Sequence, residues 1–114
     1  MKIKLLKSKI HRATVTETCL DYEGSISVDS NLLQAANILP YEKVHVLDVT
    51  NGSRLETYAI PSNEKGSICI NGAAAHLIDI NDIVIVVSYT QMQFNEAKNF
   101  KPTIIYPNEN NELQ

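Results

Sequence analysis

Residues 44–60 read VHVLDVTNGSRLETYAI, two β-type runs separated by Asn51-Gly52. Both turn residues tolerate the positive φ that a two-residue hairpin turn requires. The stretch therefore predicts a β-hairpin over residues 44–60. Because side chains alternate along a strand, Arg54, Glu56 and Tyr58 are predicted to share one face while Thr57 lies on the other.

Further short β-type runs, separated by turn signals, occur on both sides of this hairpin. They cover residues 3–6, 13–19, 25–28, 67–70, 83–88 and 103–106. Many short strands with few helices are typical of a small barrel or sandwich. The sequence therefore predicts a mainly β fold, with a single domain over residues 1–106 and a flexible polar tail over residues 107–114.

Helical signals are few. Asp29 or Ser30 can cap a helix with an apolar face, and Pro40 prevents its continuation. A short helical turn is predicted after Asn71-Gly72, where three alanines follow, and another over residues 95–100. The helices are therefore predicted to be minor additions to a strand-rich domain.

Composition excludes several classes of protein. The chain has 114 residues, 44% of them hydrophobic, and a net charge of -3, which argues against nucleic acid as a partner. No apolar run is long enough to form a signal peptide or to span a membrane. The two cysteines, Cys19 and Cys69, match no zinc or redox spacing and are predicted to be buried thiols in a reducing compartment. These observations predict a cytoplasmic protein.

Conventional catalytic motifs are missing. The histidines are too far apart in the sequence to suggest a metal site, so no metal is predicted. There is no Gly-x-Ser-x-Gly elbow and no glycine-rich phosphate loop. The stretch Tyr22-Glu23-Gly24-Ser25 lies between two strand-like runs. By itself it reads as an ordinary turn, although a glycine before a serine can also be a site of self-cleavage.

Several short motifs, in order along almost the whole chain, are together far more specific than any one of them. They are Lys9-Ile10-His11-Arg12, Tyr22-Glu23-Gly24-Ser25, Thr50-Asn51-Gly52, Arg54, Thr57-Tyr58-Ala59-Ile60, Gly66-Ser67 and Asn71-Gly72-Ala73-Ala74-Ala75-His76. With these motifs the chain resembles the pyruvoyl-dependent aspartate 1-decarboxylase family, whose members make β-alanine for pantothenate. The resemblance runs from about residue 1 to residue 106.

The resemblance implies a double-psi β-barrel with one or two short helices, assembled as a homotetramer with active sites between subunits. It also implies autocatalytic cleavage of a precursor between Gly24 and Ser25, which gives a β chain of residues 1–24 and an α chain of residues 25–114. Some members of the family use a maturation partner. No nucleic acid or membrane is implied as a partner.

The implied chemistry explains the Gly-Ser pair. Ser25 Oγ attacks the carbonyl carbon of Gly24, where a side chain would obstruct the approach. Elimination and hydrolysis then convert Ser25 into a covalent pyruvoyl cofactor. This group forms a Schiff base with L-aspartate and accepts the electron pair as carbon dioxide leaves. Tyr58 matches the family's proton donor to the resulting carbanion.

The resemblance also assigns the residues that bind substrate. Arg54 and Lys9 match the cations that hold the two carboxylates. Thr57 matches a hydroxyl used both in substrate binding and in polarising the scissile carbonyl during self-processing. The remaining residues are the substrate-binding loop Gly72, Ala73 and Ala74, and the supporting residues Asn71, Tyr22 and His11.

One alternative belongs to a different class. A non-enzymatic small β-barrel that binds a protein or ligand could keep Gly24-Ser25 merely as a turn. Such a module has no reason to combine Ser25 with Tyr58, Arg54 and Asn71, so this combination discriminates between the two hypotheses.

Overall fold

A computed structural model describes all residues from 1 to 114. Its sheet has eight strands. The elements in chain order are β1 (Lys2–Thr14), β2 (Glu17–Cys19), β3 (Ile26–Asp29), α1 (Ser30–Ala35), β4 (Lys43–Asp48), β5 (Arg54–Ser62), β6 (Ile68–Asn71), the 3₁₀ turn η1 (Gly72–His76), β7 (Ile83–Gln93), α2 (Phe94–Ala97) and β8 (Thr103–Ile105). The predicted mainly β fold with short helices is confirmed.

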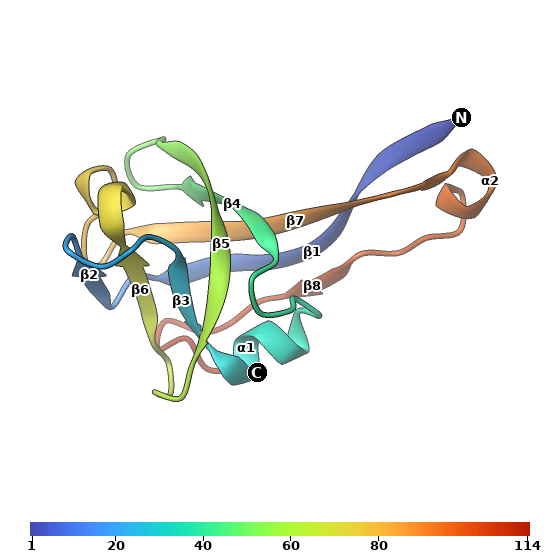
Figure 1. Ribbon diagram of the computed structural model, residues 1–114. Coiled ribbons are helices and arrows are strands. Elements are labelled where there is room, and N and C mark those ends of the chain that lie inside the picture. Colours follow the sequence, from blue (N-terminus) through green and yellow to red (C-terminus); the bar gives the residue numbers. More distant parts are fainter.

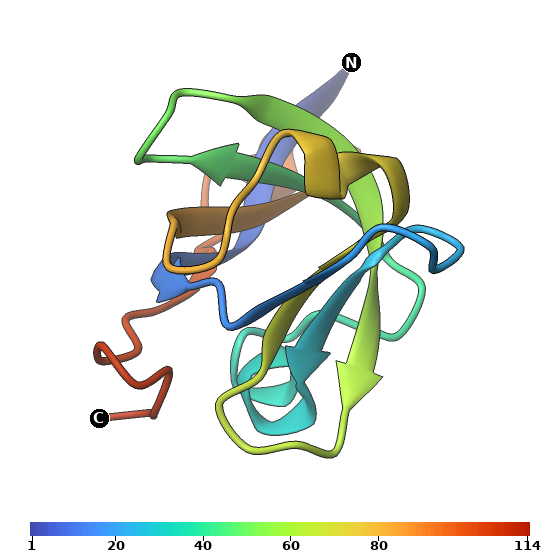
Figure 2. The same ribbon diagram turned by 90° about the vertical axis from the view of Figure 1, so that its left-hand side faces the viewer.

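The strands form one sheet in the order β2-β6-β3-β5-β4-β7-β1-β8. β1 lies next to one edge and β2 forms the other, yet only Val15 and Thr16 separate them along the chain. The N–H of Thr16 donates to the carbonyl oxygen of Ile68 at 2.9 Å, and the N–H of Val15 donates to that of Asp82 at 2.9 Å. The sheet is thereby curled into the rounded body seen in Figure 2, consistent with a small β-barrel.

The core lies inside this curled sheet. Alternate residues of β4 and β7 point inward, among them Val44, Val46, Val84 and Val86. The largest fully buried side chains from the other elements and loops are Ile10, Ile26, Leu32, Ile68, Ile70 and Ile78. The core is therefore mainly apolar, although a few polar residues such as Ser8 and Ser88 are also fully buried.

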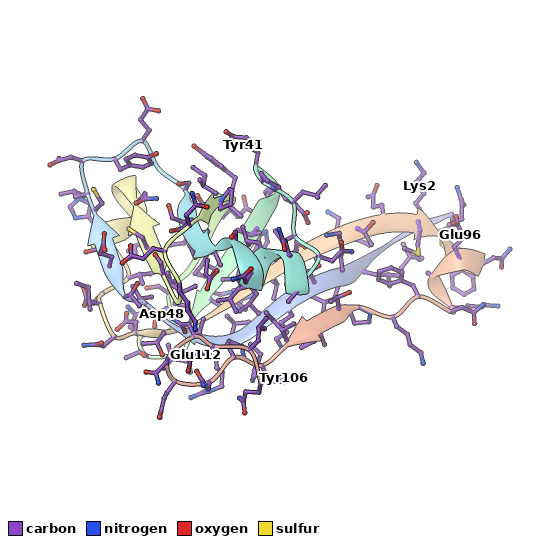
Figure 3. The ribbon with its side chains drawn as sticks, turned by 90° about the horizontal axis from the view of Figure 1, so that it is seen from below. Lys2, Tyr41, Asp48, Glu96, Tyr106 and Glu112 are labelled. Atoms are coloured by element: carbon purple, nitrogen blue, oxygen red, sulfur yellow. The ribbon has the colours of Figure 1, made fainter.

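A two-stranded arm extends from this body (Figure 1). It consists of the first part of β1 and the last part of β7, with Lys2 opposite Gln93 and Leu6 opposite Tyr89. Figure 3 shows Lys2 and Glu96 together at the tip of the arm, far from Asp48 in the body. The arm accounts for the longest dimension of the molecule, 43 Å against 29 and 24 Å. None of the helices is long and apolar enough to cross a membrane.

Most local predictions hold. The hairpin is confirmed as β4 and β5, which pair antiparallel with Val46 opposite Leu55. Its predicted two-residue turn is wrong: the N–H of Asp48 donates to the carbonyl oxygen of Ser53 at 2.8 Å, so the loop is longer, and only Gly52 of the Asn51-Gly52 pair has a positive φ. The first helix is confirmed with Asp29 as its cap, since Asp29 Oδ1 accepts a hydrogen bond from the N–H of Asn31 at 2.9 Å. The predicted turn after Asn71 is η1. The last helix begins one residue earlier and ends earlier than predicted. β1 joins the predicted strand 3–6 to the start of the predicted strand 13–19, whose end forms the separate strand β2.

The segment 107–114 is not the loose tail that its polar composition predicts. The Asn111 side chain is buried, and its Nδ2 donates to the carbonyl oxygens of Thr14 and Gly66 at 2.8 Å each. Its Oδ1 accepts from the N–H of Thr14 at 2.8 Å. The tail therefore docks through one polar side chain, a contact that leaves no apolar pattern in the sequence.

Candidate active site

The Gly24-Ser25 pair lies in the turn between β2 and β3. Gly24 has φ +104° and Ser25 has φ +89°, so two successive residues adopt a backbone conformation that side chains normally avoid. Ser25 is only 2% exposed. A buried non-glycine residue at such a φ is held there by its surroundings, and strain of this kind is concentrated at functional sites.

Asn71 forms hydrogen bonds with both the backbone and the side chain of Ser25. Its N–H donates to the Ser25 carbonyl oxygen at 3.0 Å, and its Nδ2 donates to Ser25 Oγ at 3.0 Å. Asn71 ends β6, which runs antiparallel to β3 with Ile26 opposite Ile70. The sheet therefore fixes both the backbone and the side chain of Ser25.

Gly72 packs directly against the Gly24-Ser25 turn. A Cβ atom at Gly72 would lie 2.7 Å from Gly24 Cα, 2.8 Å from Gly24 N and 3.1 Å from the Tyr22 carbonyl oxygen. Gly72 itself has φ +70°. The loop after β6 approaches the turn so closely that only glycine fits.

A shallow pocket of about 290 Å³ opens beside this turn. It brings together residues that the sequence predicted for the site. Among the residues lining it are Gly24, Ser25, Thr57, Asn71, Ala73 and Ala74. The self-processing residues and the small-residue loop are thus neighbours in a single chain.

The other predicted residues lie elsewhere, on the outer face of the sheet. Arg54 and Tyr58 alternate with Thr57 along β5, and neither of them lines the Ser25 pocket. Residues that pair directly across a sheet share a face. One such row runs Lys9, Val87, His45 and Glu56. Lys9 therefore shares the outer face with Arg54 and Tyr58.

Some charged side chains on this outer face have ion-pair partners, whereas two cations have none. Glu56 Oε1 lies 3.0 Å from His45 Nε2, and Glu56 Oε2 lies 3.5 Å from Lys43 Nζ. Lys9 and Arg54 form no ion pair within the chain. Two cations on this face are therefore available for an anionic ligand.

His11 and Tyr22 lie apart from the pocket lining. The His11 ring packs edge-on against Tyr106, with centroids 5.6 Å apart. Burial, with additional repulsion from Lys9 and Arg12, lowers the pKa of His11, so its ring is neutral at pH 7. Tyr22 contributes its backbone to the turn beside Gly72, while its side chain is exposed.

Two polar neighbours of Asn71 were missed from the sequence. Asn71 Nδ2 donates to Ser27 Oγ at 2.9 Å, and Cys69 Sγ lies 3.2 Å from Asn71 Oδ1. Each is two residues from a predicted site residue, so strand alternation was the signal that could have found them. Cys69 is buried as predicted, whereas Cys19, at the end of the edge strand β2, is exposed.

The curled eight-stranded sheet and the Ser25 pocket are consistent with a small β-barrel protein whose site is built around one buried serine. The family profile described as "Aspartate decarboxylase" matches residues 1–114. The chain therefore belongs to the aspartate decarboxylase family, as its motifs predicted. No group of three or more His, Cys, Asp or Glu side chains is placed to hold a metal ion.

Individual relatives are similar over nearly their whole length. "Aspartate 1-decarboxylase" of Campylobacter fetus subsp. fetus (strain 82-40) is 54% identical over 113 residues, which cover 99% of this chain and 98% of that protein. The protein of the same name from Campylobacter jejuni subsp. jejuni serotype O:6 is 58% identical over 97% of this chain and 88% of its own length. That of Thermoanaerobacter pseudethanolicus is 55% identical over 94% and 92%.

Proposed function

We propose that this protein converts L-aspartate to β-alanine and carbon dioxide, a step in pantothenate synthesis, after cutting its own chain between Gly24 and Ser25. The observation that carries the proposal is the state of Ser25, which is buried, left-handed in backbone conformation and hydrogen-bonded by Asn71 beside an open pocket. The substrate is taken from the names of the relatives.

Self-cleavage begins when Ser25 Oγ attacks the carbonyl carbon of Gly24. A C–O bond replaces the C–N bond and the hydroxyl proton of Ser25 is transferred to its nitrogen, so an ester forms and that nitrogen becomes an amine. Loss of the Ser25 α-proton then breaks the Cβ–Oγ bond and releases residues 1–24 with a terminal carboxylate. Water hydrolyses the dehydroalanine that remains, ammonia leaves, and residue 25 becomes a pyruvoyl group.

Three features of the chain favour this attack. The left-handed conformations of Gly24 and Ser25 store strain at the bond that breaks. Asn71 Nδ2 donates to Ser25 Oγ and so stabilises the negative charge that this oxygen carries when its hydroxyl proton leaves. Thr57 brings a hydroxyl to the same pocket, where it acts as the donor that polarises the Gly24 carbonyl.

The surroundings of residue 25 fit a pyruvoyl group. The Nδ2 donor of Asn71 already faces this side chain, and nothing lies within 4 Å of the position that a Cβ of Gly24 would take. Ala73 and Ala74 leave room in the pocket for a small substrate. Once formed, the pyruvoyl group supplies a carbonyl that reacts with the substrate amine and accepts the electron pair freed by decarboxylation.

The cations and the proton donor come from a second copy of the chain. Arg54 binds one substrate carboxylate as a bidentate fork, and Lys9 binds the other as a point charge. Tyr58 gives a proton to the α-carbon. Because none of these three residues lines the Ser25 pocket of its own chain, a neighbouring copy presents them to it. This division supports a homotetramer with its sites between subunits.

Activity is tested by incubating the purified protein with L-aspartate and measuring β-alanine and carbon dioxide. The wild-type chain should release both in equal amounts, and Ser25→Ala should remain uncleaved and inactive. A cleaved and active Ser25→Ala protein would contradict the mechanism. If the wild-type protein makes no β-alanine, even after the cell extract that supplies a maturation partner is added, the binding-module alternative is favoured.

The shared site has its own test. Ser25→Ala and Arg54→Ala chains should each be inactive alone, but co-expression should restore part of the activity. In mixed tetramers, an Arg54→Ala chain supplies the Ser25 pocket and a Ser25→Ala chain supplies Arg54. No recovery in mixed tetramers isolated through two affinity tags would place both residues in the same chain's site. The maturation partner and the cytoplasmic location stay predictions.

A further inference from the structure

Four polar side chains meet on one face of the β3–β6 pair. Ser27 and Cys69 are directly opposite each other in this antiparallel pair. Ser25 and Asn71 continue the register, since the Asn71 N–H donates to the Ser25 carbonyl oxygen at 3.0 Å. All four side chains are linked by hydrogen bonds through the amide of Asn71. The reactive serine is therefore one corner of a small buried polar cluster.

The orientation of the Asn71 amide decides what happens to the hydroxyl hydrogen of Ser25. With Nδ2 toward Ser25, Oγ accepts a hydrogen bond and its own hydrogen stays free to leave during the attack. With the amide turned over, Oδ1 would face Ser25 and hold that hydrogen. Oδ1 would also repel the negative charge that develops on Oγ. Only the first orientation favours nucleophilic attack.

Cys69 and Ser27 together select this orientation. The Cys69 thiol can donate a hydrogen bond, and at 3.2 Å from Oδ1 it holds the acceptor end of the amide away from Ser25. Burial, with the nearby Glu17, Cys19 and Glu64, raises the pKa of Cys69 and keeps the thiol protonated. Ser27 Oγ accepts the second N–H of Asn71 at 2.9 Å.

We infer that Cys69 and Ser27 are positioning residues for the cleavage of the Gly24–Ser25 bond, and that they act by orienting the amide of Asn71. The inference rests on the proposed function, and it deepens that function by adding a second layer to the site. Neither side chain contacts the bond that breaks. Their effect reaches Ser25 only through Asn71.

The test compares two substitutions of similar size at residue 69. Cys69→Ser keeps a donor, and Cys69→Val keeps an apolar side chain that suits a strand but cannot donate. Chains purified rapidly after expression are incubated, and the uncleaved fraction is followed by mass spectrometry. Cys69→Ser should cleave close to the wild-type rate. Cys69→Val should cleave about fivefold more slowly, as expected for the loss of one hydrogen bond to a buried partner.

Two controls separate orientation from packing. Cys19→Val changes the exposed cysteine and should cleave at the wild-type rate. Ser27→Ala should slow cleavage to a similar extent as Cys69→Val, because each removes one of the contacts that orient the amide. Equal slowing in Cys69→Ser and Cys69→Val would show that packing governs the rate and would overturn the inference. Wild-type cleavage by Cys69→Val would also overturn it.

If the proposed function is wrong, the wild-type chain itself stays uncleaved, which differs from slow cleavage in the variants alone. If the wild-type chain stays intact, the inference is tested on that intact chain by NMR of the Asn71 side-chain amide. Its two N–H signals should exchange with solvent faster in Cys69→Val than in Cys69→Ser and wild type. Equal exchange in all three would contradict the orienting role.

Discussion

Gly72→Ala is the substitution whose effect the structure defines most sharply. The added methyl would lie 2.7 Å from Gly24 Cα and 2.8 Å from Gly24 N. Both are backbone atoms, so no flexible side chain can move aside. The substitution therefore presses on the residue whose carbonyl carbon Ser25 attacks.

Two costs add in the free energy of unfolding. Gly72 has φ +70°, and a residue with a Cβ costs about 1–2 kcal/mol more in the left-handed conformation. Forcing a methyl into a filled space costs about 1–3 kcal/mol more. The expected loss of stability is thus about 2–5 kcal/mol. Gly52→Ala is the matched control, because Gly52 has φ +81° and nothing within 4 Å of its Cβ position. Gly52→Ala should therefore lose only the cost of the left-handed conformation, about 1–2 kcal/mol.

Urea denaturation measures this difference, and a mass-spectrometric time course measures cleavage. Relief of the contact requires a shift of about 1 Å in the Gly24-Ser25 turn, and a misplacement of that size can reduce the rate of a positioned reaction by about 100-fold. Gly72→Ala should therefore cleave far more slowly, whereas Gly52→Ala should cleave normally. If Gly72→Ala matches Gly52→Ala in both stability and cleavage, the close approach of the loop to the turn does not matter.

Three further outcomes follow from the site and the fold. Tyr58→Phe should self-cleave normally but lose at least about 100-fold in turnover, measured as β-alanine formed per cleaved chain, because its hydroxyl is the proton donor. Normal turnover would remove Tyr58 from that role. Asn111→Ala should lower the free energy of unfolding in urea by about 3 kcal/mol, about 1 kcal/mol for each of its hydrogen bonds to Thr14 and Gly66; an unchanged urea midpoint would mean that the docked tail adds no stability. Burial alone would raise the pKa of Glu42, but hydrogen bonds and Lys7 lower it overall. Its contribution to stability is therefore present above the ordinary pKa of a glutamate and lost as the pH falls through the lowered one. Glu42→Gln should flatten the acid side of the stability profile measured by urea unfolding, and an unchanged profile would contradict this.

Local signals in the sequence were sufficient for the hairpin and the first helix. Asn51-Gly52 marks the turn between β4 and β5, although the turn is longer than the predicted two-residue one, since Leu47 pairs with Arg54. Asp29 caps α1 as its side chain predicts. Both elements depend on residues close together in the chain, where propensity and turn chemistry act directly.

Long-range pairing could not be predicted in the same way. β1 continues as one strand through Lys7, Ser8 and Lys9, which interrupt the apolar pattern, because β7 and β8 pair with it on both sides. Asn111 docks on Thr14 although the two residues are 97 positions apart. Neither contact leaves a periodic signal, because each depends on backbone or amide groups that meet only after the sheet has closed.

The candidate site was predicted in part. Family motifs identified Ser25, Thr57 and Asn71, and the structure places them around one pocket. Alternation along β5 predicts that Tyr58 and Thr57 lie on opposite faces of the strand, and in the structure Thr57 lines the pocket whereas Tyr58 does not. Cys69 was read as a buried thiol, since its contact with Asn71 depends on the pairing of β3 with β6.

The most direct test of the central claim is a denaturing mass spectrum of the purified wild-type protein. Self-cleavage at the strained Gly24–Ser25 bond predicts two fragments, one ending at Gly24 and one of residues 25–114. The larger fragment should be lighter by one ammonia than a chain that begins with serine, because residue 25 has become a pyruvoyl group. A single intact mass that persists through prolonged incubation, with the maturation partner supplied, would contradict the account.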